Sequence, residues 1–269
     1  STLLPQKARF DANIFLERVF PRWLPLAHKN FLIPNQERFP RRHLKHLNQI
    51  ETVLCKTRHA MDIFSQYANV RHIGFTSTDR SLPGVKKSYG SCFHLAGRST
   101  LKGTATLLDL WNRHPDWPEL TIIQCSENAP KLVPENVRLL SGYLSSEDLI
   151  TELNQHGIHL CTSLSEGWGH YIVEAMSCQA VVVTTDAPPM NEIVNPETGI
   201  LVPYGSEAPR HLGTNFYADP ESLARRLNHL FQLSEEHKRL YGKKARAWFE
   251  ANQQNFVGSF PRILQSLLN

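Results

Sequence analysis

Two glutamates with seven residues between them bracket a glycine-containing loop, and their carboxylates are the groups best placed for chemistry. Glu166 opens the loop 166–169, and Glu174 lies just over one turn into a helix that we expect to start near His170. An apolar segment at 158–161 precedes the loop and is typical of a buried strand. In a strand–loop–helix unit the backbone N–H groups and the positive end of the helix dipole point out of the sheet. The loop therefore suits an anion, above all a phosphate.

The glycines and carboxylates of this loop allow two interpretations. Gly167 and Gly169 let a ligand approach the backbone without a Cβ in the way. Glu174 leans back toward the start of its helix, over the same pocket, where a pair of sugar or ribose hydroxyls is a natural partner for a carboxylate. In the alternative, Glu166 caps the helix and Glu174 is a solvated helix residue. The spacing alone does not decide between the two.

A second cluster follows the expected strand 92–96. That strand ends in a turn that starts at Gly97 and carries two cations, Arg98 and Lys102. An arginine fork and a lysine point charge together neutralise a diphosphate. Taken alone, the same two side chains are also typical of a solvated surface.

Short apolar runs alternate with helix patterns along the chain, which predicts βαβ units and mostly parallel sheets. The expected strands are 12–16, 30–33, 52–55, 70–74, 92–96, 120–124, 137–140, 158–161, 180–184 and 200–202. The expected helices are 102–113, 146–155, one from Pro220 to about Leu233, and one that begins after Ser234. Beyond Trp248 the pattern predicts a broken helix, interrupted by Gly258 and Pro261.

Four pieces of the chain, in order, carry a family resemblance. They are the turn Gly97-Arg98 with Lys102-Gly103, the turn Gly142-Tyr143-Leu144 before the acidic helix start at 147–148, the segment from Glu166 to Glu174, and the run 181–202. From about Phe93 to Val202 the chain is similar to the nucleotide-sugar-binding domain of retaining GT-B glycosyltransferases, the family 4-like "glycosyl transferases group 1" superfamily. The resemblance implies an α/β fold of GT-B type, with two Rossmann-like domains built on parallel sheets, the N-terminal one shortened.

The resemblance also implies a role for each matching residue. Glu166 would be catalytic, facing the transferred sugar near the reacting carbon. Arg98 and Lys102 would bind the donor diphosphate, and Glu174 the ribose hydroxyls. The other donor-binding positions would be Gly142, Tyr143 and Leu144 beside the base, and Gly167, Trp168, Gly169, His170 and Tyr171 around phosphate or sugar. His170 stands where an aliphatic residue is commoner, so either its side chain takes part or it supplies only a backbone amide.

The implied reaction moves a sugar from a nucleoside-diphosphate sugar to a hydroxyl of a polysaccharide or glycolipid acceptor, with retention. Fixed cations and a helix N-terminus stabilise the negative charge that develops on the leaving diphosphate. The resemblance implies no metal and no cofactor besides the nucleotide-sugar co-substrate, and the chain contains no Asp-x-Asp motif. The alternatives are a non-catalytic nucleotide-sugar-binding module of a larger assembly, a GT-B epimerase, and a phosphorylase, which usually needs a pyridoxal-phosphate lysine.

Charge divides the 269 residues near a polar stretch. Residues 1–89 hold 15 Lys/Arg and 6 Asp/Glu, whereas residues 90–269 hold 14 and 19. The change of sign coincides with the segment 80–90, which contains Pro83, Gly84 and Gly90 and is typical of a linker. We therefore predict a shortened acceptor-side domain at 1–89, a donor domain at 90–240, and C-terminal helices at 241–269 that pack back on the first domain.

The partners of the basic first third are less defined. Its densest basic run consists of Arg38, Arg41, Arg42, His43, Lys45 and His46. One interpretation is a solvated surface. The other is contact with an anionic acceptor, a lipid-linked phosphate or the inner leaflet of a membrane, as a peripheral protein. Nucleic acid is disfavoured, because no aromatic-interleaved or helix-turn-helix pattern accompanies the charge.

Cysteines and hydropathy bear on the compartment. Five scattered cysteines form no CxxC pair, which indicates a reducing, cytoplasmic environment without structural disulfides. No window approaches the ~18 uninterrupted apolar residues of a membrane-spanning helix.

Overall fold

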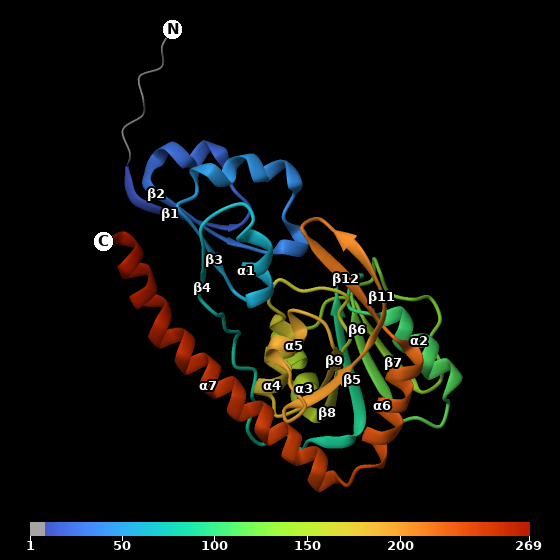
Figure 1. The fold of residues 1–269 in the computed structure, drawn as a ribbon. Coiled ribbons are helices and arrows are strands. Elements are labelled where there is room, and N and C mark those ends of the chain that lie inside the picture. The colour runs from blue at the N-terminus through green and yellow to red at the C-terminus, as the bar shows by residue number, and fades with distance from the viewer. Residues whose placement is uncertain (1–8) are drawn as a thin grey trace.

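The computed structural model describes residues 9–269 and contains two parallel β-sheets (Figure 1). The first consists of β1 (Phe10–Glu17), β2 (Ala27–Pro34), β3 (Thr52–Cys55) and β4 (Val70–His72), in the spatial order β1-β2-β3-β4. All three strand pairs are parallel. The four strands predicted for this region are confirmed.

The second sheet has six strands in the order β10-β9-β8-β5-β6-β7. Its members are β5 (Ser88–Gly97), β6 (Leu120–Gln124), β7 (Val137–Ser141), β8 (His156–Cys161), β9 (Val181–Thr185) and β10 (Gly199–Val202). Every pair is parallel, and each residue of the central strands β8 and β9 is buried. Burial on both faces explains why these strands read as continuous apolar runs. All six were predicted.

Helices begin where the sequence places a capping residue. Their bounds are α1 (Arg58–Phe64), α2 (Thr104–Arg113), α3 (Ser146–Gln155), α4 (His170–Ser177), α5 (Met190–Ile193) and α6 (Pro220–Gln232), with 3₁₀ turns η1 (Pro21–Leu26), η2 (Gln36–Arg38) and η3 (Arg41–Gln49). The side chains of Thr57, Ser145 and Asp219 each accept a backbone N–H in the first turn of α1, α3 and α6. Each bond satisfies a donor that the helix itself leaves unpaired.

The C-terminal segment forms one helix, so the prediction of a broken helix and of separate C-terminal helices at 241–269 is wrong. α7 (Glu235–Leu268) continues through Gly258 and Pro261. The proline removes the N–H that would reach the carbonyl of Val257, but that residue is 63% exposed, so water replaces the partner. Figure 1 shows α7 passing both sheets, and the ammonium of Lys29 donates to the carbonyl of Leu267 (2.7 Å) at its far end.

An antiparallel hairpin, which the sequence did not reveal, follows the second sheet. It consists of β11 (Tyr204–Arg210) and β12 (Gly213–Ala218). The N–H of Leu212 in its turn donates to the carbonyl of Gln36 in η2 (3.3 Å), and the N–H of Phe216 donates to the carbonyl of Leu164 (2.7 Å). The hairpin therefore joins the first sheet's loops to the loop before α4.

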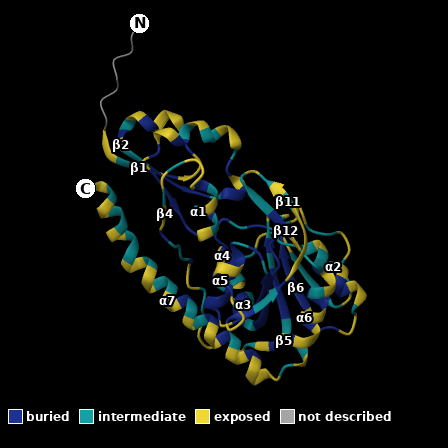
Figure 2. Ribbon diagram, in the orientation of Figure 1, coloured by how far each residue is buried: buried dark blue, intermediate teal, exposed yellow. Residues whose placement is uncertain are grey.

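Burial separates strands from helix surfaces, with strands mostly buried and the outward helix faces exposed (Figure 2). Each sheet has its own apolar core, and Phe260, Ile263, Leu264 and Leu267 of α7 pack on the core of the first sheet. β5 begins at Ser88, inside the predicted linker 80–90, and the division into domains stays a prediction. Within residues 9–269 no helix has both the length and the apolar character that crossing a bilayer requires.

Candidate active site

A cavity of about 500 Å³ lies between the carboxyl ends of the two sheets. The first sheet contributes Glu17 at the end of β1 and Lys56 directly after β3, and the second contributes the loop 166–170 after β8. Phe75, from the segment that joins the sheets, closes one side. This is the edge at which open parallel sheets bind ligands, as the sequence predicted for the loop after β8.

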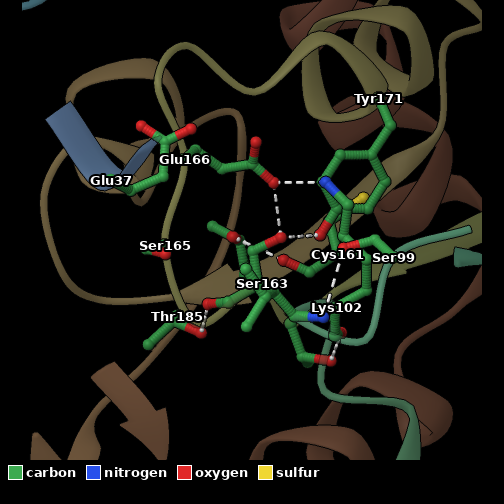
Figure 3. A network of polar contacts seen from close by, with 12 residues as sticks. Glu37, Ser99, Lys102, Cys161, Ser163, Ser165, Glu166, Tyr171 and Thr185 are labelled. Atoms are coloured by element: carbon green, nitrogen blue, oxygen red, sulfur yellow. Dashed lines mark hydrogen bonds and ion pairs between the residues drawn. The ribbon is translucent and has the colours of Figure 1, made fainter. Parts of the chain in front are cut away.

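Glu166 and Lys102, predicted from separate motifs, form an ion pair (Figure 3). Their side chains are only 12% and 17% exposed. The hydroxyl of Ser163 donates to Oε1 of Glu166 (2.6 Å) and also lies 2.6 Å from the hydroxyl of Tyr171. The ammonium of Lys102 lies 3.7 Å from the centroid of the Tyr171 ring, a cation–π geometry. The four side chains therefore form one connected polar cluster under the loop.

Gly103 explains how Lys102 reaches this cluster. Gly103 has φ +76°, and a Cβ there would collide with the carbonyl oxygen of Thr162. Glycine is required on both counts, because the left-handed backbone and the close approach exclude a side chain. The turn after β5 thus contacts the loop after β8, and the lysine beside that turn points at Glu166.

The N-terminus of α4 faces the same cavity. Its N-cap residue is Gly169, with φ +107°, and no side chain among residues 9–269 caps the helix. The first amide N–H groups of α4 are thus available to an anion, as the sequence predicted. Gly167 lies against Asn35 of the first sheet so closely that a Cβ would collide with the Asn35 side chain. The loop is held between both sheets.

The side chain of His170 has a defined place. Its Nδ1 lies 2.9 Å from the hydroxyl of Ser77, which also accepts from the indole N–H of Trp168 (3.3 Å). His170 lines the cavity, and its ring packs edge-on against Phe75. Burial, followed by the charge of Lys56, lowers the pKa of His170, so the ring is neutral at pH 7.

Three predicted positions lie apart from the cavity lining. Arg98 is exposed at the end of β5, and in the described chain its guanidinium makes no hydrogen bond. Tyr143, in the turn 142–144 after the edge strand β7, is 95% exposed. Glu174 faces Arg80, with Oε1 3.4 Å from Nε. Burial raises the pKa of Glu174, and the charge of Arg80 opposes that rise. The ligand roles of Arg98, the 142–144 turn and Glu174 stay predictions, as do those of Glu166, Lys102 and the loop.

The first sheet adds polar residues that sequence reasoning missed. Glu37 lines the cavity and is 5% exposed; Lys56 is 7% exposed and hydrogen bonds to the side-chain oxygen of Asn35. The Asn35 amide in turn donates to Glu17 (3.2 Å). A signal for them was present, because each follows directly or closely on a buried parallel strand, where ligands bind.

These neighbours shift each other's protonation. Burial raises the pKa of Glu37, and the charge of Glu166 raises it further, against its own backbone hydrogen bond and the charge of Lys56. Burial lowers the pKa of Lys56, which the charges of Glu37, Glu17 and Glu166 oppose. Carboxyl and amine are thus both displaced toward their neutral forms, as in many functional sites.

Comparison with solved structures identifies the fold. The chain superposes on the pneumococcal O-GlcNAc transferase GtfA in complex with UDP and GlcNAc with a TM-score of 0.71 at 13% identity, over 95% of this chain and 57% of that one. Sucrose-phosphate synthase from Thermosynechococcus elongatus gives a TM-score of 0.71 at 15% identity, over 96% and 73%. The fold is GT-B. The prediction of a GT-B fold with two Rossmann-like parallel sheets is confirmed.

Sequence comparison reaches part of the chain. The family model described as "Glycosyl transferases group 1" matches residues 126–248, which include Glu166, Glu174 and the α4 loop but not Arg98 or Lys102. No protein of curated function matches the chain in sequence. A third GT-B structure, Anabaena Alr3699/HepE in complex with UDP and glucose, has a TM-score of 0.66 at 18% identity, over 91% of this chain and 73% of that one. The chain spans little more than half of GtfA and 54% of TarM.

Proposed function

We propose that this chain is a glycosyltransferase of the family 4-like "glycosyl transferases group 1" superfamily, moving a sugar from a nucleoside-diphosphate donor to an acceptor hydroxyl. The observation that carries the proposal is the Lys102–Glu166 pair beside the uncapped N-terminus of α4, at the cavity between the sheets. The family match over 126–248 supports it. Two GT-B neighbours hold UDP together with a sugar, so UDP-sugars are the first donors to test.

The groups at the site suit this reaction. Cleavage of the bond between the anomeric carbon and phosphate leaves charge on the diphosphate, which the α4 amides, Lys102 and the mobile-ended Arg98 are suited to stabilise without a metal. Glu166 would face the transferred sugar, while Lys102 balances its charge. We propose retention at the anomeric carbon together with the family assignment, and a polysaccharide or glycolipid as acceptor.

Calorimetry with UDP-, GDP- and ADP-sugars, followed by donor-hydrolysis and transfer assays, tests the proposal. Lys102→Ala should weaken donor binding about 10- to 100-fold, the loss expected for a charged hydrogen-bond partner. Glu166→Ala should lower the transfer rate more than donor affinity. The control is Lys131→Ala, because Lys131 is exposed and distant from the cavity lining. Activity that survives both site substitutions would show the assignment to be wrong.

The same assays address the main alternative, a non-catalytic nucleotide-sugar-binding module. Binding that depends on Lys102, without hydrolysis or transfer of any donor, would favour the module. Turnover that Glu166→Ala removes would favour the enzyme. The two outcomes differ in the catalytic step alone, so both assays must use one preparation.

We further propose that the basic face of the first sheet contacts an anionic membrane surface from a reducing, cytoplasmic compartment. Arg41, Arg42 and Lys45 are exposed on η3, and Trp23 on η1 is 54% exposed. Basic side chains with an aromatic anchor are typical of interfacial binding. Four of the five free cysteines are buried, in keeping with thiols that act as small apolar side chains. Sedimentation with phosphatidylserine vesicles at low and high salt tests the contact.

A further inference from the structure

Glu37 is a buried carboxyl with an unused hydrogen-bonding atom. Its Oε2 has no hydrogen-bond partner within residues 9–269, and the nearest cation in an ion pair with it is Arg38, with Nε 3.8 Å from Oε1. Leaving a buried carboxylate oxygen unpaired is costly, and such groups in native proteins usually have a reason. Glu37 lines the cavity, so a ligand there is a ready partner.

Glu37 lies on the opposite wall of the cavity from the catalytic candidate. Figure 3 shows the Glu37 and Glu166 carboxyl groups near one another, one from η2 and the other from the loop after β8. The two segments are joined directly, because the side-chain amide of Gln36 donates to the carbonyl of Glu166 (2.8 Å). A group bound to Glu37 is therefore held at a fixed place relative to Glu166.

Lys56 belongs to the same wall. Its ammonium is held by the Asn35 side chain and lies 5.2 Å from the centroid of the Phe75 ring. It keeps further donors for a ligand, since an ammonium has three and a single bond to Asn35 uses one. Glu37 supplies an acceptor and Lys56 a donor, the pair that a hydroxyl group uses, because a hydroxyl both donates and accepts.

The balance of charge on the cavity argues against an anionic ligand on this wall. Its lining holds three carboxyls, Glu17, Glu37 and Glu166, against the two cations Arg38 and Lys56. Of the basic run 38–46, only Arg38 lines the cavity. An added anion would increase an existing excess of negative charge in a partly desolvated site, which is unfavourable. An uncharged polyhydroxyl compound meets no such cost.

We propose that Glu37 and Lys56 bind hydroxyl groups of an uncharged saccharide, the acceptor, and thereby place it opposite Glu166. The inference rests on the proposed transferase function for the word acceptor, whereas the saccharide site stands on the geometry alone. Leu16, Ile33 and Phe75 line the cavity beside these polar groups and offer apolar contact to the C–H faces of a sugar ring. Both residues are positioning residues rather than participants in bond cleavage.

The test is binding of the full chain, with UDP present, to an array of neutral and anionic glycans, followed by calorimetry with the best neutral oligosaccharide. Glu37→Leu removes both oxygens at similar volume and should weaken saccharide binding about 10- to 100-fold. Lys56→Met should weaken it as well. Glu51→Leu is the matched control, because Glu51 is exposed in the same part of the chain and does not line the cavity. Melting curves confirm that each variant folds.

Three results would overturn the inference: no neutral glycan bound, anionic glycans bound more tightly than neutral ones, or equal affinity for Glu37→Leu and Glu51→Leu. Affinity for UDP, measured on the same variants, should be unchanged within about twofold. That measurement separates the two proposals. If the chain binds a neutral saccharide through Glu37 but turns over no donor, the transferase assignment fails and the saccharide site stands.

Discussion

The carboxylate of Glu192 in α5 accepts a hydrogen bond from the backbone N–H of Arg58 (2.7 Å) at the start of α1. Its other oxygen accepts from the N–H of His59 (2.8 Å). A side chain from the second sheet thus supplies the negative charge and the acceptors that the first turn of a helix on the first sheet requires. The two halves of the cavity are fastened together at this point.

Glu192→Ala should lower the free energy of unfolding by about 1 kcal/mol, the usual value of such a cap. It should also speed proteolysis in the connecting segment 73–87, because the sheets separate more readily. Urea denaturation and limited proteolysis measure the two effects. Glu197→Ala is the control, since Glu197 is 77% exposed and makes only a 3.7 Å contact with Lys244. Equal behaviour of the two variants would show that the cap does not hold the sheets.

The Lys102–Glu166 pair should show strong energetic coupling. Lys102→Met leaves a carboxylate that is 12% exposed without its cation, which should cost about 2 kcal/mol of stability. Adding Glu166→Gln removes the stranded charge and should restore most of that loss. A double-mutant cycle in urea measures the coupling, expected to exceed about 1 kcal/mol. The exposed Lys244–Glu197 pair serves as the comparison and should give less than about 0.5 kcal/mol. Additive effects at 102 and 166 would contradict the pairing.

The strands were predictable because their signal is local. β8 and β9 are buried on both faces, so their apolar runs are visible without any knowledge of their neighbours. The hairpin β11–β12 has no such signal, because most of β11 is exposed and its sequence, Tyr204 to Arg210, reads as a polar loop. It is held by contacts with η2 and Leu164, which are tertiary. α7 likewise passes Pro261 because both sheets support it.

The candidate site divides in the same way. Glu166 and Lys102 carry motif spacing, and the structure brings them together as the two turns imply. Glu37 and Lys56 carry no spacing, since they become neighbours of Glu166 only when the first sheet closes over the second. A rule that applies to any parallel sheet, that ligands meet the carboxyl ends of its strands, would have found them.

Acid should destabilise the protein through His94. Burial lowers the pKa of this histidine to about 4, while its Nδ1 bonds the carbonyl of Leu160 (2.7 Å) and its Nε2 the hydroxyl of Thr104 (2.9 Å). The unfolded chain takes up a proton near pH 6.5 and the native chain near pH 4. Stability from this group is therefore present above pH 6.5 and declines as pH falls toward 4, by roughly 3 kcal/mol in total.

His94→Gln should reduce that slope while leaving the other buried histidines to contribute theirs. Urea titrations between pH 8 and pH 4.5 compare the two proteins, and their free energies of unfolding should converge toward acid. At pH 8 the variant should be the less stable, since it loses the link between α2 and β8. Parallel pH curves would mean that His94 takes up its proton equally in the folded and unfolded states.

Two glycines of α7 offer a matched test of how this helix is seated. At Gly242 a Cβ would collide with the carbonyl oxygen of Gln179, directly after α4, whereas at Gly258 it would meet only the end of Arg262 at 3.9 Å. Gly242→Ala should therefore lower the free energy of unfolding by about 1–3 kcal/mol through overpacking. Gly258→Ala should raise it by about 0.5–1 kcal/mol, because alanine favours an exposed helix interior. Opposite signs in thermal and urea unfolding are the expected result. If both alanines stabilise the protein equally, α7 does not pack against α4 at Gly242 in solution.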